Sequence, residues 1–223
     1  MHVAELWRYP VKSMAGEQLQ MARVTPTGIE GDRIVQVQNA RGRTATSRTY
    51  PGLLGFKATL DERGEPLVDG LLWSDPAVLA AVREVVGPGA RLVRDESPSR
   101  FDILPLLVAT DGALAEFGRD RRRLRPNIVV GGVTGLDERE WEGGRLFAGS
   151  AVIDIHDLRG RCIMTSFDPD TLAHDPEVLR DIVRRFGGKL ALNCGVATPG
   201  EIRVNQEVAV VRPGTVLNHC CPN

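Results

Sequence analysis

The chain has 223 residues, of which 42% are hydrophobic and 26% charged, the balance of an ordinary globular protein. Lysine and arginine number 28 against 29 acidic residues, so the formal net charge is -1 and no overall field favours nucleic acid or a membrane surface. No apolar run approaches the roughly 20 residues of a membrane helix. Residues 1–8 lack the basic and apolar regions of a secretory signal. The sequence therefore predicts a cytoplasmic protein without nucleic-acid or membrane partners.

Short β-like runs dominate the first part of the chain. Apolar or alternating patterns predict strands at residues 3–7, 19–24, 33–37 and 55–60, with a hairpin turn at 61–65. The first helix is expected at residues 74–86, because Ser74 or Asp75 can cap it and Pro76 suits a first turn. Gly87 is expected to end it.

The second part mixes helices and strands. A helix capped by Thr110 is expected from residue 111 to about 119, and another at 176–186, ended by Gly187. Strands are expected at residues 152–156, 161–165, 201–204 and 207–211. Many short strands with about three helices, and no regular βαβ alternation, predict an α+β fold with barrel-like sheets. A soft division falls near residues 98–100.

Common enzyme motifs are missing. The sequence has no P-loop, dinucleotide fingerprint, nucleophile elbow or zinc-protease motif. Asp154 and His156 would share one face of a strand, where a solvated strand edge is favoured over a metal pair. His219 and the two cysteines after it are assigned to a C-terminal tail at 216–223 rather than to a zinc site.

The four cysteines show no disulfide framework, so each is judged alone. Cys162 follows Arg161, whose guanidinium favours the thiolate, the form that binds soft metals. The alternative is a buried apolar cysteine in a strand. Cys194 is expected to be a core cysteine beside a turn at residues 195–196, with a second redox thiol as the alternative.

Cations and hydroxyls recur on separate loops. Lys12 and Ser13 follow the first strand, Arg33 follows a glycine-rich loop, and Arg125 enters a later strand. A phosphate and a polar heterocycle would need such groups, because arginine forks match phosphate oxygens and lysine adds a point charge. Each loop taken alone would be interpreted as a solvated basic loop.

Together these motifs resemble the MOSC superfamily, named for the C-terminal domain of molybdenum-cofactor sulfurases. More closely, the chain resembles the two-part type found in amidoxime-reducing components and their bacterial relatives. The resemblance runs from the Tyr-Pro-Val-Lys-Ser segment at residues 9–13 to residue 204. It implies an N-terminal β module at 1–98, a barrel-like MOSC domain at 99–215 and a tail at 216–223.

The resemblance also implies a set of site residues. The cysteine of the Arg-Cys motif, here Cys162, would be the molybdenum ligand and the catalytic residue, and Lys12 would lie at the cofactor's phosphate. The positions that would bind molybdopterin are Lys12, Ser13, Arg33, Thr46, Ser47, Arg48, Thr110, Arg125, Asn127 and Arg161. The chain departs from the family pattern at Gly160, where relatives often have serine, at Leu172, and at residues 204–206.

The implied activity is the molybdenum-cofactor-dependent reduction of N-hydroxylated compounds, such as amidoximes and hydroxylamines. Electrons would come from an external protein, a flavoprotein or a haem or iron–sulfur carrier, because the chain carries no flavin or iron–sulfur motif. Two alternatives stay open. One is a cofactor or sulfur carrier that uses a Cys162 persulfide, and the other is a non-enzymatic module that binds a phosphorylated ligand.

Overall fold

The computed structural model describes residues 1–214. One large sheet organises the molecule, with the strand order β17-β13-β14-β15-β11-β12-β1-β2. Its members are β1 (His2–Arg8), β2 (Glu17–Leu19), β11 (Leu106–Thr110), β12 (Ile128–Gly131), β13 (Arg145–Ala148), β14 (Ala151–Gly160), β15 (Lys189–Thr198) and β17 (Val208–Val211). Only β11 and β12 pair in parallel within this described sheet. The strand-rich α+β class is confirmed.

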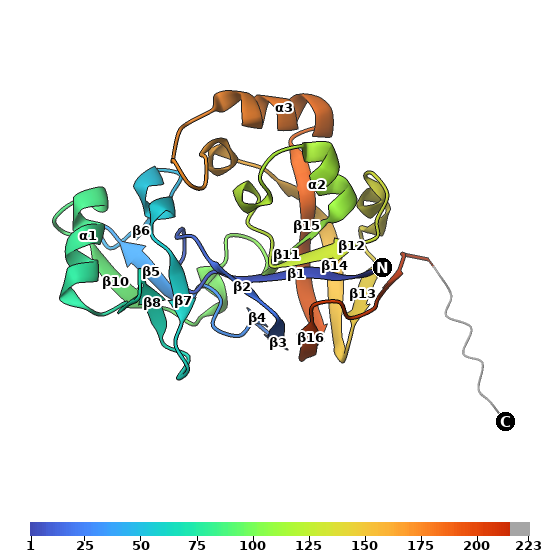
Figure 1. Cartoon of the computed structure of the whole chain (residues 1–223), viewed down its shortest axis with the longest axis horizontal. Helices are drawn as coiled ribbons and strands as arrows, with labels where there is room; N and C mark the ends of the chain where they lie inside the picture. The colour runs from blue at the N-terminus through green and yellow to red at the C-terminus, as the bar shows by residue number, and fades with distance from the viewer. Residues whose placement is uncertain (215–223) are drawn as a thin grey trace.

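The other strands of the described residues form three small sheets. One joins β16 (Gly200–Arg203), β3 (Met21–Thr25) and β4 (Gly28–Ile29). A second joins β10 (Arg91–Arg94), β5 (Val35–Gln38) and β6 (Thr44–Ala45), and a third joins β7 (Ala58–Leu60), β8 (Pro66–Val68) and β9 (Leu71–Leu72). The last two sheets and helix α1 form a lobe at one end of the molecule (Figure 1).

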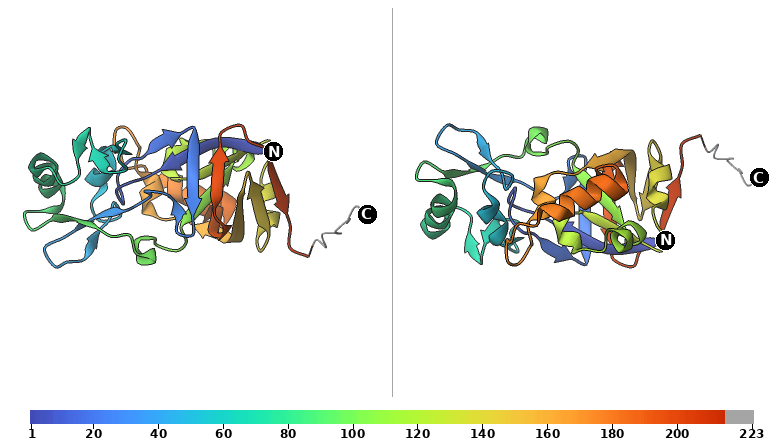
Figure 2. Two further views of the ribbon diagram at one scale, coloured as in Figure 1. Left: turned by 90° about the horizontal axis from the view of Figure 1, so that it is seen from below. Right: turned by 90° about the horizontal axis from the view of Figure 1, so that it is seen from above.

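Local signals account for the three α-helices found within residues 1–214. In α1 (Pro76–Val86) the Asp75 carboxylate accepts a hydrogen bond from the amide of residue 77, and Pro76 occupies the first turn. Helix α3 (Pro176–Phe186) has the predicted bounds and lies over the large sheet (Figure 2). Helix α2 (Asp111–Phe117) is capped by Thr110 as predicted but ends earlier, because Gly118 adopts a left-handed conformation.

Several strand predictions were wrong. Residues 19–24 form parts of two strands, β2 and β3, and residues 161–165 form no strand. Residues 163–166 are instead a 3-10 helix, η5 (Ile163–Ser166), with Cys162 at its N-cap. The predicted strand at 55–60 is shortened to β7, because the 3-10 helix η1 (Pro51–Gly55) precedes it.

The strand β15 was missed, and the turn predicted at residues 195–196 lies inside it. Residues 190–194 are buried in succession, because β15 lies between β14 and β11 and α3 packs against it. A strand covered on both faces shows no alternation of apolar and polar residues. Cys194 is fully buried, and burial raises the pKa of its thiol, which agrees with a core cysteine.

The two parts of the chain interleave both in the large sheet and in the small sheet that contains β3 and β16. β1 pairs with β12, and β3 pairs with β16, so strands from before residue 98 are hydrogen-bonded to strands from after it. The lobe has its own apolar core, which includes Val35, Leu53 and Val82. The domain bounds at 98 and 99 stay a prediction, and the predicted tail, with Cys220 and Cys221, lies outside the described residues. Within residues 1–214 no helix is long and apolar enough to cross a membrane.

Candidate functional site

A cleft of about 430 Å³ lies where loops from the two parts of the chain meet. It gathers nine of the eleven predicted site residues, which are Lys12, Ser13, Arg33, Thr46, Arg48, Arg125, Asn127, Arg161 and Cys162. The first five follow β1, β4 or β6, and the other four lie before β12 or after β14. We refer to this site as the cationic cleft. The structure brings the predicted residues together, while their roles stay predictions.

The charge of the cleft is strongly unbalanced. Its lining includes seven cationic side chains and one carboxylate, Asp102. The Lys12 ammonium lies 2.8 Å from one oxygen of Asp102, and the Arg48 guanidinium lies 2.5 Å from the other. Burial alone would raise the pKa of Asp102, but Lys12, Arg48 and Arg159 together hold it below its usual value. A cleft with this excess of positive charge favours an anionic ligand.

Cys162 lines this cleft and lies between the end of β14 and the start of η5. It is only partly buried, and its carbonyl accepts hydrogen bonds from the amide and hydroxyl of Thr165 at 3.0 and 2.9 Å. Burial works against the charged form of Arg48, but Asp102 and a hydrogen bond with the Cys162 side chain outweigh it and raise the pKa of Arg48. The thiol is therefore accessible and in contact with a cation.

Two other arginines of the cleft, Arg125 and Arg161, are partly buried. The Arg125 guanidinium lies 4.2 Å from the centroid of the Tyr9 ring, and Arg161 donates to the Leu124 carbonyl at 2.7 Å. Burial lowers the pKa of each to about 10, so both stay charged at neutral pH. Arg125 Nη2 and Arg161 Nε are buried without a partner among the described residues. Unpaired buried donors are costly, and an anionic or polar ligand would relieve that cost.

Three residues of the cleft have a backbone conformation that residues other than glycine rarely adopt. Ser13, Arg33 and Arg125 have φ values of 71°, 55° and 57°. A non-glycine residue in this left-handed region costs on the order of 1–3 kcal/mol, and such residues cluster at functional sites. Around Arg33 the loop is held by Asp32, which is fully buried and accepts hydrogen bonds from the Tyr9 amide at 2.7 Å and from Asn127 at 3.2 Å.

Three predicted residues do not present free polar groups to the cleft, and the Ser47 hydroxyl is buried without a partner among the described residues. Asn127 lines the cleft, but its side chain accepts from the Leu107 amide and donates to Asp32 and Trp7. Ser47 and Thr110 are fully buried and do not line the cleft. Thr110 caps α2 and donates to Glu138 at 3.2 Å.

The buried Glu138 carboxyl, which accepts a hydrogen bond from Thr110, leads us to expect that stability depends on pH. Glu138 is fully buried, one of its oxygens has no partner among the described residues, and burial raises its pKa. The folded state therefore favours the protonated carboxyl. The stability that protonated Glu138 contributes is fully present below the ordinary glutamate pKa. It is lost as pH rises through the raised pKa that Glu138 has in the folded state.

We expect Glu138→Gln to be more stable than the wild type at pH 8 by about 1 kcal/mol, with the gain shrinking towards pH 4, because glutamine cannot ionise. Thermal unfolding at a series of pH values measures this difference. Glu62→Gln, an exposed turn position, is the control and should track the wild type. A Glu138→Gln gain that is independent of pH would contradict the assignment.

Sequence reasoning missed four polar residues that line the cleft: Asp102, Arg123, Arg159 and Asn193. Arg159 donates to Asn193 at 3.1 Å across the paired strands β14 and β15. Two of these residues had a signal in the sequence. Arg123 belongs to the basic run at residues 121–123, and Arg159 lies three residues before Cys162. No sequence signal distinguishes Asp102, because its position depends on a long loop.

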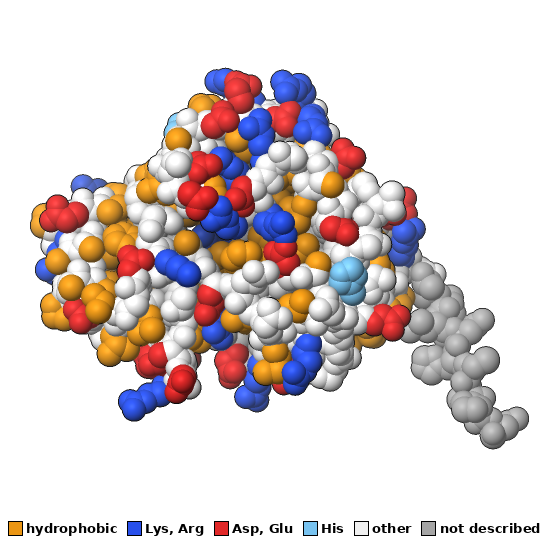
Figure 3. All heavy atoms as spheres, in the orientation of Figure 1, with side chains coloured by type: hydrophobic (Ala, Val, Ile, Leu, Met, Phe, Trp, Pro, Cys, Tyr) orange, Lys and Arg blue, Asp and Glu red, His pale blue; other side chains and the backbone are white. Residues whose placement is uncertain are grey.

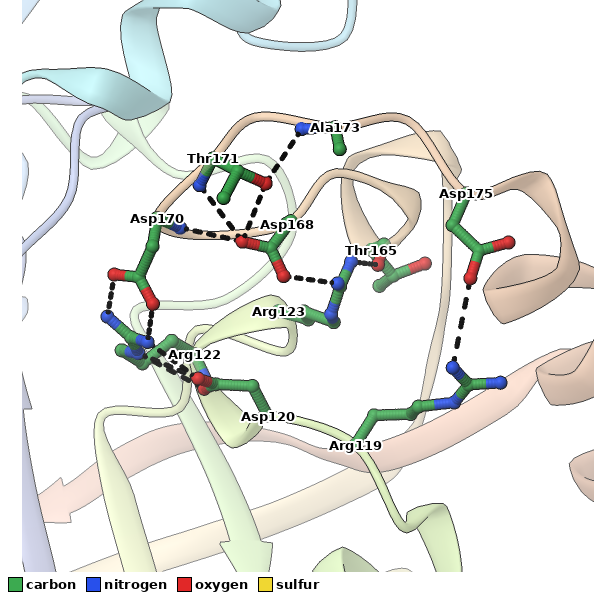
Figure 4. Close-up of polar contacts among 10 residues, drawn as sticks. All are labelled: Arg119, Asp120, Arg122, Arg123, Thr165, Asp168, Asp170, Thr171, Ala173 and Asp175. Atoms are coloured by element: carbon green, nitrogen blue, oxygen red, sulfur yellow. Dashed lines mark hydrogen bonds and ion pairs between the residues drawn. The ribbon is translucent and has the colours of Figure 1, made fainter.

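Ion pairs fix the segment that follows Cys162. Arg123 contacts Asp168 at 2.8 Å and the Thr165 carbonyl at 3.2 Å, and Arg122 contacts Asp170 at 2.6 Å (Figure 4). Asp168 also accepts hydrogen bonds from the amides of residues 170 and 171, which is the behaviour of a turn residue. On the face shown in Figure 3, basic and acidic side chains intermingle near the centre, below α3.

Comparison with known proteins agrees with this architecture. Residues 1–76 match the family model of the MOSC N-terminal beta barrel domain, and residues 111–209 match that of the MOSC domain. Mitochondrial amidoxime reducing component 2 of Macaca fascicularis is 26% identical over 242 aligned residues, which cover 82% of this chain and 72% of that protein. Mitochondrial amidoxime-reducing component 1 of Homo sapiens is 25% identical, over 76% of this chain and 67% of that protein.

A solved structure supports the fold. The YuaD protein from Bacillus subtilis superposes with a TM-score of 0.52 at 16% sequence identity, and the match covers 94% of both chains. At this identity the likeness concerns the fold alone. With the two family matches covering most of its length, the chain belongs to the MOSC superfamily, as a member that combines the N-terminal β-barrel domain with the MOSC domain.

Proposed function

We propose that this protein is a molybdenum-cofactor-dependent oxidoreductase that reduces N-hydroxylated compounds, with Cys162 as the protein's ligand to molybdenum. The observation that carries the proposal is a partly exposed cysteine in a cleft whose lining includes seven cations and one carboxylate. The relatives named as amidoxime-reducing components support the choice of reaction.

The residues of the cleft suit a molybdopterin. Lys12, Ser13 and Arg33 would bind its phosphate, for which they offer an ammonium, a hydroxyl and a guanidinium. Arg125 and Arg161 retain buried donors without partners in the described part of the chain, and a polar heterocycle would satisfy them. A thiolate at Cys162 matches the preference of soft metals for sulfur.

When bound, the cofactor supplies two-electron redox chemistry, which the side chains of this protein lack. The overall reaction takes an N-hydroxylated substrate, two electrons and two protons to the amine or amidine and water, with cleavage of the N–O bond. Arg48 and Asp102 are hydrogen-bonded groups beside Cys162 and would orient the polar end of the substrate. Electrons would come from an external flavoprotein or a haem or iron–sulfur carrier.

The test is to purify the protein from a host that makes molybdenum cofactor and to measure metal, pterin and turnover together. We expect near-stoichiometric molybdenum and pterin, and reduction of benzamidoxime to benzamidine with a reduced viologen dye as electron donor. Protein from a host that cannot make molybdopterin is the control and should be inactive. Molybdenum without turnover would favour a cofactor or sulfur carrier, and the absence of both metal and pterin would favour a module that binds another phosphorylated ligand.

A further inference from the structure

A second cavity, of about 760 Å³, adjoins the cationic cleft. Arg123, Arg125 and Met164 line both spaces and therefore form a shared wall. Tyr9 lines only the second cavity, yet the guanidiniums of Arg33 and Arg125 lie 5.2 and 4.2 Å from its ring centroid. The Tyr9 ring thus lies against two arginines of the cleft and forms part of the wall of the second cavity, which we refer to as the groove.

The groove has apolar and aromatic walls supplied by both parts of the chain. Leu54 contributes from the lobe, and Met164 and Phe167 contribute from the segment that follows Cys162. Phe167 is held in place by stacking on His174, with 4.7 Å between the ring centroids. Gly16 also lines the groove, and a Cβ atom there would come within 2.2 Å of the Arg8 carbonyl oxygen and 2.5 Å of the Tyr9 ring, so only glycine fits against this part of the wall.

The lining of the groove carries a smaller excess of positive charge than the lining of the cleft. It includes two carboxylates and four cations, which are Lys57, Arg122, Arg123 and Arg125. Glu17 pairs with Arg8 at 2.8 Å, and Arg122 pairs with Asp170 at 2.6 Å. Arg123, in the shared wall, pairs with Asp168 at 2.8 Å, while Lys57 is exposed to solvent. The groove therefore attracts an anion less strongly than the cleft does, and its apolar walls favour the organic part of a ligand.

We propose that the groove binds the organic part of the substrate and selects N-hydroxylated compounds with a flat aromatic or apolar body, an inference that rests on the function proposed above. A body of that kind would bury its surface against Leu54 and Phe167. Met164 lies two residues after Cys162 in the chain and lines both spaces, so the N–O end of a ligand in the groove would reach the cleft beside it. A flexible methionine at this junction adapts to ligands of different shape.

The experiment fills the groove and compares a large substrate with a small one. Leu54→Trp enlarges a side chain of the groove wall without touching the cationic cleft. In the cofactor-loaded enzyme we expect the KM for benzamidoxime to rise about 10-fold or more, the scale of a lost apolar contact in a binding pocket. The kcat/KM for hydroxylamine, which has no organic body, should stay within about 2-fold. Leu72→Trp, an exposed leucine of the same lobe outside the groove, is the matched control and should change neither value.

Direct binding keeps this inference separate from the proposed activity. Titration of the loaded protein with benzamidoxime, followed by calorimetry, should show saturable binding that Leu54→Trp weakens and Leu72→Trp does not. Thr59→Trp, from another wall of the groove, should have the same effect and replaces Leu54→Trp if that variant does not fold. Binding of this kind without turnover would refute the proposed activity and leave the groove assignment standing. Equal effects on both substrates, no effect on either, or no saturable binding would overturn the groove assignment.

Discussion

Cys162→Ser is expected to abolish N-reductive turnover while leaving the fold as stable as that of the wild type. Loss of groups that merely orient a metal ligand costs about 10–100-fold in affinity or activity, so loss of the ligand itself should exceed about 100-fold. Because Cys162 is partly exposed at the N-cap of a short 3-10 helix, we expect the free energy of unfolding to change by less than about 0.5 kcal/mol. Molybdenum content, turnover with benzamidoxime and thermal unfolding are the three measurements.

Cys194→Ala is the matched control for this variant. Cys194 is fully buried in β15 and does not line the cationic cleft. We expect its replacement to lower the free energy of unfolding by about 1 kcal/mol and to leave molybdenum content unchanged. If Cys162→Ser keeps its molybdenum and its turnover, Cys162 is not the metal ligand.

Asp32→Asn is expected to lower the free energy of unfolding of the metal-free protein by about 3 kcal/mol. Asp32 is fully buried, forms an ion pair with Arg33, and accepts from the Tyr9 amide and from Asn127. An amide in its place would turn one acceptor into a donor that faces other donors and would leave the Arg33 charge without its partner. Urea unfolding measures the loss.

Asp170→Asn is the comparison for Asp32→Asn. Asp170 also pairs with an arginine, Arg122, but both side chains are exposed, and solvent screens the interaction. We expect its replacement to change stability little. If the two variants lose a similar free energy of unfolding, the burial of Asp32 does not explain the contribution of its ion pair to stability.

The positions of α1 and α3 and the loops that carry the cations were recoverable from the chain alone. Asp75 with Pro76 and Asp175 with Pro176 mark helix starts through hydrogen bonds and backbone constraints within a few residues. Loops that carry Lys12 or Arg33 are likewise recognisable, because turn residues and charged residues are local properties of the sequence.

Burial patterns and residue pairings depended on tertiary structure. Residues 190–194 of β15 are all buried by packing in the folded chain, so they lack the alternation that identifies a half-exposed strand. Thr110 and Asn127 were predicted as site residues from sequence motifs. In the folded chain their side chains donate hydrogen bonds to Glu138 and Asp32, which lie far away in the sequence.

The site itself shows the same division. Cys162 and the cations of the cleft were identified as chemical groups from the sequence, whereas the partial exposure of the thiol, its contact with Arg48 and the role of Asp102 came from the fold. The groove had no sequence signal, because its walls come from β-strands, loops and a 3-10 helix far apart in the chain. Sequence by itself determined which chemistry the chain carries, and long-range packing decided which of those groups face one another, because side-chain direction and burial depend on non-local contacts.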